Sequence, residues 1–296
     1  MLNDVHCHFF SQPFFTALAR QRGDATDADG AAVTQHLGWD APGTAEALAD
    51  RWVAALDTAG VQQCALIASI PGDEGSVAAA VARHPTRFVG FFMVDASAHD
   101  AADRVTRAIQ QDRLKAVCLF PAMHHVPLTD DRTLRIVEAA AASGGAVFVH
   151  CGVLSVGVRR KLGLASRFNL RLGDPLAVAA LALQFPETPF LIPHFGAGLF
   201  RETLMAADAA PNIHVDTSSS NSWVRYHPGL TLEQVFASAL AVMGASRVLF
   251  GTDSSFFPRG WQRPIFEQQQ RTLDSLGVTD ADRAMILSGN FQRLFA

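Results

Sequence analysis

Two histidines stand one residue apart near the amino terminus of the chain, at His6 and His8. Their segment is typical of a short β-strand, in which successive side chains point to opposite faces. We therefore expect the two imidazoles on one face of the strand and Val5, Cys7 and Phe9 on the other. Neutral imidazole is the commonest metal ligand among side chains, so the pair could bind a metal ion. Two packed histidines would give the same pattern, and the pair alone does not distinguish these interpretations.

Later apolar segments end in three further side chains that could bind a metal, His150, His194 and Asp253. Each follows a run that is typical of a buried strand. If these strands run parallel, their carboxyl ends meet at one edge, where parallel α/β folds place their ligand sites. Of the 11 histidines in the chain, few would end a strand by chance. We therefore interpret the five residues as a metal site rather than as core packing.

An alternation of strands and helices must position these side chains. Eight mostly apolar, strand-like runs cover residues 3–10, 63–69, 87–94, 114–120, 144–150, 188–194, 212–216 and 246–253. Helical runs cover residues 14–20, 45–59, 76–83, 101–112, 130–142, 175–185, 199–209 and 232–243, and further helical segments continue to residue 295. Apolar strands with helical crossovers indicate a parallel sheet covered by helices. Eight such units predict an α/β fold, a (β/α)₈ TIM barrel, as one domain over residues 1–296 rather than a doubly wound sheet.

Two of these helices carry sequence signals at their starts. Thr44 precedes the first long helical run and can cap it through its hydroxyl, although the full capping box is absent. Asp174 is followed by Pro175, which gives an N-cap with a proline in the first turn. Both signals fix where a helix begins.

The composition narrows the class of protein. With 49% hydrophobic and 18% charged residues, the chain can bury a sizeable core. Its net charge of -4 gives no argument for binding nucleic acid or an anionic membrane. No apolar run reaches the roughly 20 residues of a membrane span, and we expect no signal peptide before the first strand. No Gly-x-Gly-x-x-Gly follows a strand and no Gly-Lys-Ser/Thr loop is present, which weakens a nucleotide-binding interpretation.

All four cysteines lie inside apolar, strand-like runs, at Cys7, Cys64, Cys118 and Cys151. No two of them are closely spaced, so the pattern favours buried thiols over a disulfide framework. Thiols of this kind persist in reducing compartments. We therefore expect a cytoplasmic protein that acts on a small molecule and has no nucleic-acid or membrane partner.

The order of the five site residues along the chain resembles the amidohydrolase superfamily. His6-x-His8 lies on the first strand, His150 ends the fifth, His194 the sixth and Asp253 the eighth. The chain is most similar to the amidohydrolase-related branch (amidohydrolase 2) that includes aminocarboxymuconate-semialdehyde decarboxylase and 2-pyrone-4,6-dicarboxylate lactonase. Its ending, Ser-Gly-Asn-Phe-Gln-Arg-Leu-Phe, is similar to the usual Gly-Asn-x-x-Arg-Leu-Phe of that branch. The resemblance implies a distorted TIM barrel of the metal-dependent hydrolase type.

The resemblance also implies roles for these residues. The implied metal ligands are His6, His8, His150 and Asp253. The implied catalytic residues are Asp253, which would accept a proton from the attacking water, and His194, a neighbouring acid–base group.

The fourth strand bears on the number of metal ions. Superfamily members with two metals bridge them through a carbamylated lysine at the end of this strand, whereas Lys115 lies at its start here. A single divalent ion is therefore expected. Three imidazoles and one carboxylate suit Zn²⁺ first, with Mn²⁺ or Fe²⁺ as alternatives, and leave a position for water.

Two reactions fit one ligand set, so the sequence does not separate them. The first is hydrolysis of a C–O or C–N bond, in a lactone or amide, of a small carboxylated molecule by a metal-activated water. The alternative is non-oxidative decarboxylation of an aromatic or unsaturated acid. A third interpretation, a non-catalytic metal-binding barrel, is weaker because all five site residues are intact.

Three loops at the predicted rim offer substrate-binding side chains. The basic loop after the fifth strand contains Arg160 and Arg167, which could hold a substrate carboxylate, although a solvated loop explains the same charges. His124, after the fourth strand, could contact substrate or lie on the surface. The hydroxyl-rich loop at residues 216–225, with its single aromatic Trp223, could bind substrate, orient metal ligands or form a turn without a role.

Two expectations rest on position alone. Residues 22–43 are polar and glycine-rich without a clear period, and a loop of this length is usually a lid, a binding loop or disordered. Barrels of the amidohydrolase-related branch often form homodimers, which the resemblance extends to this chain as an expectation.

Overall fold

Eight parallel strands pair in the order in which they occur along the chain, from β1 to β8. The computed structural model describes residues 1–23, 30–218 and 220–295. The strands are β1 (Asn3–Phe9), β2 (Gln63–Ala68), β3 (Phe88–Met93), β4 (Ala116–Leu119), β5 (Ala146–Val149), β6 (Phe190–Ile192), β7 (Ile213–Asp216) and β8 (Val248–Leu249). The segment from β8 onward also bonds to β1, since Val5 N donates to Phe250 O over 3.0 Å and Asp253 N to His6 O over 2.9 Å. The predicted TIM barrel is confirmed.

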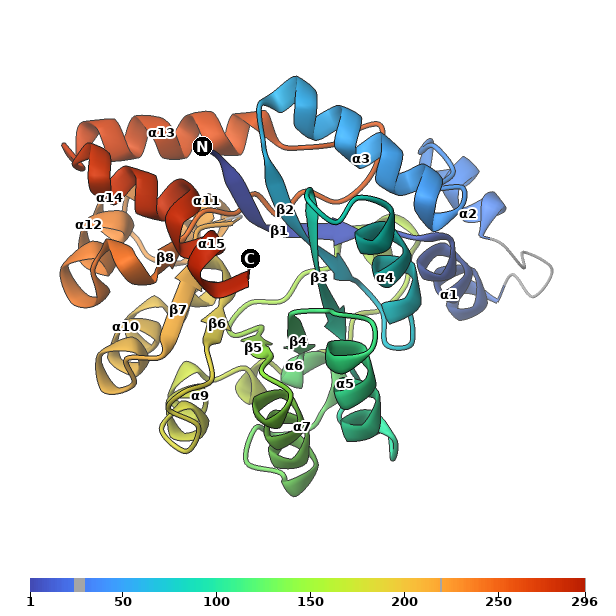
Figure 1. The fold of residues 1–296 in the computed structure, drawn as a ribbon, viewed down its shortest axis with the longest axis horizontal. Coiled ribbons are helices and arrows are strands. Elements are labelled where there is room, and N and C mark those ends of the chain that lie inside the picture. The colour runs from blue at the N-terminus through green and yellow to red at the C-terminus, as the bar shows by residue number, and fades with distance from the viewer. Residues whose placement is uncertain (24–29, 219, 296) are drawn as a thin grey trace.

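Helices surround this barrel on its outer face (Figure 1). They are α3 (Ala45–Ala59), α4 (Glu74–Arg83), α5 (Ala101–Gln110), α7 (Asp131–Ala142), α9 (Pro175–Ala182), α10 (Phe200–Ala209), α12 (Leu232–Met243) and α13 (Arg263–Ser275). Short helices follow the carboxyl ends of strands, namely α1 (Gln12–Arg22), α2 (Ala31–Leu37), α6 (Pro121–His124), α8 (Gly157–Lys161) and α11 (Ser220–Trp223). The chain closes with α14 (Asp280–Ala284), a π-helical turn (Met285–Gly289) and α15 (Asn290–Phe295), and short 3₁₀ turns lie at Leu170–Leu172, Pro193–Gly196, Val224–Tyr226 and Ala245–Arg247.

Helices α3 and α9 begin at the capping residues that the sequence predicts. The Thr44 hydroxyl accepts a hydrogen bond from Ala47 N over 3.2 Å at the start of α3. The Asp174 carboxylate accepts one from Leu176 N over 2.9 Å, with Pro175 in the first turn of α9. A capping hydrogen bond of this kind contributes about 1 kcal/mol. The predicted bounds 45–59 and 232–243 are confirmed to the residue.

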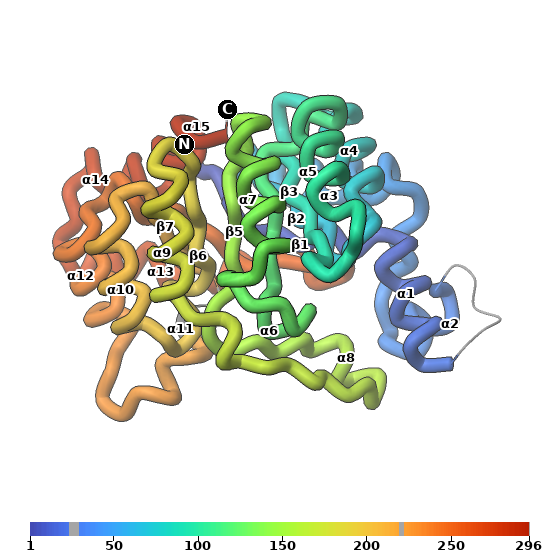
Figure 2. The backbone as a smooth tube through the Cα atoms, turned by 90° about the horizontal axis from the view of Figure 1, so that it is seen from below, coloured from blue at the N-terminus to red at the C-terminus, as the bar shows by residue number. Residues whose placement is uncertain are grey.

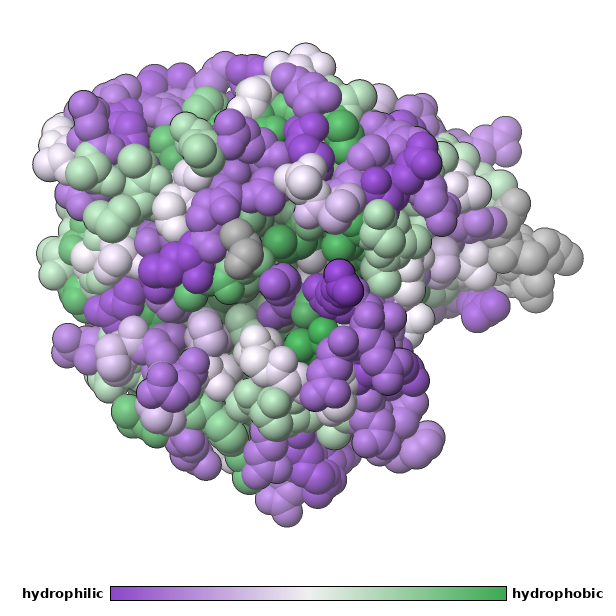
Figure 3. Space-filling model, in the orientation of Figure 1, coloured by the Kyte–Doolittle hydropathy of each residue, from purple (hydrophilic) through white to green (hydrophobic). Residues whose placement is uncertain are grey.

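The barrel interior is filled from the strands and from the last helix. Phe91, Phe148 and Leu191 belong to one buried cluster together with Phe291 and Phe295 of α15. The Phe91 and Phe295 rings lie 5.0 Å apart, so α15 closes the amino-terminal end of the barrel, where both chain termini lie (Figures 1 and 2). Figure 3 shows this end as a surface of hydrophilic side chains with apolar ones scattered among them. The opposite end, formed by the carboxyl ends of the strands, is left for the site.

The expected alternation along β1 is only partly correct. His6 and His8 do face the same way, but Val5 belongs to the interior cluster, whereas Cys7 and Phe9 pack in the outer cluster between sheet and helices. The pairing with β2 changes register between Asp4 and Cys7. A β-bulge inserts one extra residue and reverses the facing of the residues on one side of it, which a strict period of two cannot anticipate.

Three other predicted segments differ from the structure. The region 22–43, predicted without regular structure, contains α2, and its residues 24–29 lie outside the described residues. The run 188–194 forms a strand only over Phe190–Ile192, because the backbone then turns left-handed. The run 246–253 is a strand only over Val248–Leu249. Both strands shorten where the chain leaves the sheet to place a site residue.

The structure also bears on two expectations from the sequence, the state of the cysteines and the absence of a membrane-spanning segment. Cys7, Cys64, Cys118 and Cys151 are all buried free thiols, as predicted. Within residues 1–23, 30–218 and 220–295, none of the helices has the length and apolar character needed to cross a bilayer.

His214 on β7 makes the stability of the barrel dependent on pH. Burial lowers its pKa from 6.5 to about 3, and the charges of Arg293 and Arg247 add to this shift. Below about pH 6.5 the unfolded chain gains a proton there that the folded chain does not take up, so this contribution to stability is lost as the pH falls. Between about pH 7 and pH 4, we expect the free energy of unfolding to fall by roughly 3 kcal/mol more in the native protein than in His214→Gln.

Urea denaturation of both proteins at the two pH values measures this difference. The exposed His36, replaced by Gln, is the matched control and should behave like the native protein. Equal losses in the native protein and in His214→Gln would contradict the prediction.

Candidate active site

Three donor atoms meet at the carboxyl end of the barrel. His6 Nε2 lies 3.4 Å from His8 Nε2 and 3.6 Å from Asp253 Oδ1, and His8 Nε2 lies 3.2 Å from the same oxygen. Ligands at about 2.0–2.2 Å around a tetrahedral Zn²⁺ are about 3.3–3.6 Å apart. The spacing of these three donors therefore fits the ligand set of a small divalent ion.

His150 and His194 lie beside this cluster without being part of it. The His194 ring is 4.8 Å from the His6 ring and 5.3 Å from the His150 ring, between centroids. His150 is buried, and its Nδ1 has no hydrogen-bond partner in the described part of the chain. An unpaired buried nitrogen is costly, so the ring is suited to a ligand that the protein itself does not supply. The structure thus brings all five predicted residues to one place, with His150 farther out than the other proposed ligands.

The charge states of these groups suit metal binding. Burial lowers the pKa of His6 and, more strongly, of His150, where the neighbouring histidines add to the effect. Burial would raise the pKa of Asp253, but the hydrogen bond from His8 and the charges of His6 and His194 lower it below its usual range. Neutral imidazoles and an ionised carboxylate are the forms that ligate metals.

A buried carboxylate, Asp216 at the end of β7, holds two of the site histidines. Its Oδ2 accepts a hydrogen bond from His6 Nδ1 over 2.8 Å, and its Oδ1 accepts one from His194 N over 3.0 Å. The Ser218 carbonyl in turn accepts one from His194 Nδ1 over 2.7 Å. Because Nδ1 carries the proton in both rings, each Nε2 keeps its lone pair. The sequence indicated this loop as a whole but did not single out Asp216 or Ser218. The only sequence feature that could have indicated Asp216 is its position as a carboxylate at the end of an apolar strand.

Replacing Asp216 with asparagine is expected to weaken metal binding about 10- to 100-fold, the usual cost of losing a carboxylate behind a ligating histidine. The amide cannot accept a hydrogen bond from His6 Nδ1 with the strength of a carboxylate, so the ring loses its fixed orientation. Competition of Zn²⁺ between the protein and a chelating dye measures the change. Asp208→Asn, an exposed carboxylate on α10, is the control. An unchanged affinity in a folded Asp216→Asn protein would contradict the role.

A second buried carboxylate, Asp4, joins the two ends of the sheet beneath the cluster. It accepts hydrogen bonds from His6 N over 2.9 Å, from the Thr252 hydroxyl over 2.5 Å and from Trp261 Nε1 over 2.7 Å. Thr252 precedes Asp253 directly. The Asp4 side chain therefore holds the backbone at His6 and at Thr252, on the two segments that carry the proposed metal ligands.

Site residues lie in an unusual backbone conformation. His194, Phe195 and Ala197 have positive φ values of 56°, 50° and 43°, and Gly196 between them has 82°, which makes a left-handed turn directly after β6. Asp253 also has a positive φ, of 58°. Non-glycine residues with such φ values cost about 1–2 kcal/mol each and persist where the surroundings hold them. The Asp216 bond to His194 N is one such restraint.

The cluster opens into a cavity of about 970 Å³, at the upper end of the range for small-molecule sites. Among its lining residues are His8, His150, His194 and Asp253. All four predicted substrate-binding residues also line it, namely Arg160, Arg167, His124 and Trp223. Trp223 is 3% exposed, and its indole Nε1 has no partner in the described residues. The structure therefore places every residue of the sequence prediction in the lining of one cavity except His6, which is buried behind it.

Helices α1 and α8 form one wall of this cavity, and α2 packs against them. Their apolar side chains pack together as a separate cluster that includes Phe14, Leu18, Val33 and Val158. In Figure 2, α8 runs along the carboxyl-end edge of the barrel toward α1 and α2. The basic loop after β5 is therefore a wall of the site.

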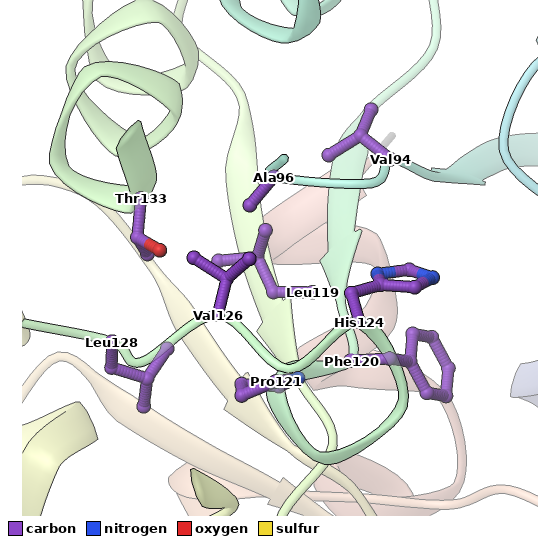
Figure 4. A pocket seen from close by; sticks show the side chains of 9 residues that line it. All are labelled: Val94, Ala96, Leu119, Phe120, Pro121, His124, Val126, Leu128 and Thr133. Atoms are coloured by element: carbon purple, nitrogen blue, oxygen red, sulfur yellow. The ribbon is translucent and has the colours of Figure 1, made fainter. Parts of the chain in front are cut away.

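His124 lies between this cavity and a hollow of about 10 Å³ behind β4, since it lines both. Figure 4 shows His124 and Phe120 at one side of the hollow and Thr133 of α7 at the other. Burial lowers the pKa of His124, so the ring is neutral at pH 7. Its neighbour His125 donates instead to Arg167 O over 2.6 Å, which ties the loop after β4 to the basic loop.

Comparisons with known proteins show similarity of fold and family. A 5-carboxyvanillate decarboxylase from Novosphingobium aromaticivorans, solved with manganese and 4-hydroxy-3-methoxy-5-nitrobenzoic acid, is 15% identical, with a TM-score of 0.68 over 100% of this chain and 96% of that one. A protein from Acinetobacter baumannii, named as a probable 2-pyrone-4,6-dicarboxylic acid hydrolase and solved with citric acid, is 14% identical, with a TM-score of 0.61 over 99% and 98%.

A curated relative matches only part of the chain. Protein fluG of Emericella nidulans is 24% identical over 161 residues, which are 53% of this chain and 17% of that protein. The chain thus spans about a sixth of the length of this relative. The family model described as amidohydrolase, in contrast, matches residues 4–296. The chain belongs to the amidohydrolase family.

Proposed function

We propose that the protein is a single-metal hydrolase that cleaves a C–O or C–N bond, in a lactone or an amide, of a small carboxylated molecule. The observation that carries the proposal is the cluster of His6 Nε2, His8 Nε2 and Asp253 Oδ1, 3.2–3.6 Å apart, at the wall of a cavity of about 970 Å³. His150, with its unpaired buried Nδ1, completes the proposed ligand set.

Three imidazoles and one carboxylate suit Zn²⁺ first, and Mn²⁺ or Fe²⁺ also accept such ligands. When bound, the ion supplies a Lewis acid and lowers the pKa of its water to about 7. The side chains around it then determine where protons go.

Asp253 is the proposed proton acceptor. Its side chain is 30% exposed, so a water molecule in the cavity can reach the carboxylate. Its lowered pKa keeps it ionised near pH 7. As the water oxygen bonds to the carbonyl carbon, Asp253 takes the water proton and then passes it to the leaving oxygen or nitrogen as the old bond breaks.

His194 is the proposed second acid–base group. Its Nδ1–H is committed to the Ser218 carbonyl, so Nε2 is the atom that can exchange a proton or polarise the substrate carbonyl. The left-handed turn fixes this ring, so the group is held in place before substrate binds.

The charge of the cavity supports a carboxylated substrate. Six cationic side chains line it, namely Arg159, Arg160, Lys161, Arg167, Arg225 and Arg259, against the carboxylates of Asp95 and Asp253. Within the described residues, none of these six forms an ion pair, whereas seven arginines elsewhere do. Unpaired positive charge around a cavity attracts anionic ligands. Arg160 and Arg167, the predicted carboxylate binders, are members of this set.

A second reaction, decarboxylation of an aromatic acid, is favoured by the aromatic side chains of the cavity. Phe10, Phe14 and Phe120 are among the residues that line it, and they offer apolar surface to a planar ring. In this reaction the C–C bond to the carboxylate breaks and CO₂ leaves, while a proton that Asp253 or His194 has first taken up from a water molecule goes to the ring carbon. The same residues serve both reactions, so only the identity of the product distinguishes hydrolysis from decarboxylation.

A product screen with the Zn²⁺- and Mn²⁺-loaded protein tests the proposal. Lactones, amides and aromatic acids are offered separately, and acid release and CO₂ release are measured independently. We expect acid release without CO₂ from a lactone or amide, lost in Asp253→Asn. CO₂ as the only product would overturn hydrolysis in favour of decarboxylation. No turnover of any class, with metal bound, would favour a non-catalytic metal-binding barrel.

A further inference from the structure

Four side chains from three distant segments form a stack at the wall of the cavity. The Trp39 and Phe256 rings lie 3.5 Å apart between centroids and only 11° from parallel. Lys161 Nζ lies 5.4 Å from the Trp39 centroid, and Arg259 Cζ lies 4.8 Å from the Phe256 centroid. All four residues line the same cavity as His8 and Asp253 of the proposed metal site.

The order of the stack follows from its spacing. Two rings 3.5 Å apart leave no room between them, so each cation must lie on the outer face of its ring. The layers therefore run Lys161, Trp39, Phe256, Arg259. Each cation–π contact contributes about 0.5–1 kcal/mol at an exposed site. Because both outer faces are covered, the stack offers no free ring face to a substrate, and its effect is to hold the Arg259 guanidinium against the Phe256 ring.

A hydrogen bond fixes the same guanidinium a second time. Arg259 Nη2 donates to the Ser255 hydroxyl over 2.7 Å, and Ser255 is buried. Ser255 is two residues after Asp253, so this contact holds Arg259 against the segment that carries the carboxylate of the metal cluster. Partial burial lowers the pKa of Arg259, and the charge of Asp253 opposes this shift, which places the two groups within electrostatic reach.

Most of the donors of Arg259 remain available. A guanidinium has five N–H donors, and among the described residues only the Ser255 hydroxyl accepts from this one. Its side chain is exposed, and it forms no ion pair with a described carboxylate. A planar, always charged fork with free donors is the arrangement that binds a carboxylate with two parallel hydrogen bonds.

We propose that Arg259 is the carboxylate-binding residue of this site, held in place by its stack on Phe256 and its bond to Ser255, and that it selects substrates carrying a carboxylate beside the reacting group. The inference rests on the proposed carboxylated substrate and sharpens it. Arg160, on α8, is not held by a stack, so its contribution to carboxylate binding is smaller.

Binding of isophthalate, a ring with two carboxylates, tests the subsite without turnover. Isothermal titration of the Zn²⁺-loaded protein compares isophthalate with the neutral diamide, isophthalamide. We expect the native protein to prefer isophthalate. In Arg259→Met we expect its Kd to rise about 10- to 100-fold, the effect of losing hydrogen bonds to a charged partner. Arg259→Lys, which keeps the charge but not the fork, should lie between. Arg171→Met, at an exposed arginine outside the lining of the cavity, is the control and should change Kd less than threefold.

The outcomes separate this inference from the proposed reaction. An isophthalate Kd in folded Arg259→Met equal to the native value would overturn the subsite, as would an equal loss in Arg171→Met. Native protein that binds the diamide as tightly as the diacid would overturn it as well. Because titration needs no catalysis, failure of the product screen leaves this result intact. With a hydrolysable substrate in hand, Arg259→Met should raise KM while kcat changes little.

Discussion

Replacing His8 with alanine is expected to remove the metal ion and to lower kcat by about 10³-fold or more, because the ion supplies several kcal/mol of transition-state stabilisation. His8 Nε2 lies 3.4 Å from His6 Nε2 and 3.2 Å from Asp253 Oδ1, so its loss leaves two of the three closest donors. His8 is only partly buried, and its other ring nitrogen contacts the Ser69 hydroxyl. The variant should therefore fold, whereas His6→Ala would also remove one hydrogen-bond partner of the buried Asp216 carboxylate.

Metal content after dialysis against a weak chelator measures the first effect, and activity with added Zn²⁺ or Mn²⁺ the second. His36→Ala on the exposed face of α2 is the control and should keep the native stoichiometry. Treating the native protein with a strong chelator should reproduce the loss of activity, reversibly. Full metal content in His8→Ala would remove His8 from the ligand set.

Replacing Gly152 with alanine is expected to lower the free energy of unfolding by more than about 3 kcal/mol, since an added Cβ must displace backbone. That Cβ would lie 2.2 Å from Gly196 O and 2.4 Å from Ala197 O. Both atoms belong to the left-handed turn that follows His194. The turn must move, and His194 moves with it, so we also expect kcat to fall about 100-fold in whatever protein still folds.

The chain offers a matched control for this substitution. Gly144 has a φ of 71° against 67° for Gly152, but a Cβ added at Gly144 would meet no described atom within 4 Å. Gly144→Ala therefore measures the cost of a positive φ alone, about 1 kcal/mol. Urea denaturation of both variants separates this cost from the clash. Equal losses in the two would show that the contact between Gly152 and the turn has no energetic weight.

The regular parts of the fold were predictable because their signals are local. Helices α3 and α12 follow from their apolar pattern, with the Thr44 cap at the start of α3, and both agree with the prediction to the residue. The convergence of the five proposed site residues was predictable because His6 and His8 lie on the first strand, the other three follow later apolar strands, and parallel strands end at one rim. A pattern within one segment was sufficient for each helix, and the site needed only the same kind of pattern repeated at several strands.

What could not be predicted depends on contacts between segments. Asp216 acts on His6 across 210 positions of sequence, and nothing in its own neighbourhood indicates that partner. The stack of Lys161, Trp39, Phe256 and Arg259 joins three segments that share no periodicity. The β-bulge near Val5 arises from register with β2. Such features follow from the assembled sheet and not from any single stretch.

The bond from Thr252 to Asp4 spans 248 positions, and this has a consequence for folding. The metal cluster takes two donors from the first strand and one from the segment after the last, so its ligand set is complete only when the barrel has closed. Closing so long a loop is slow and entropically costly. Metal binds the native state preferentially and stabilises it by mass action. A partly synthesised chain therefore has only the two β1 donors, His6 and His8. Tight metal binding then requires the complete, closed barrel.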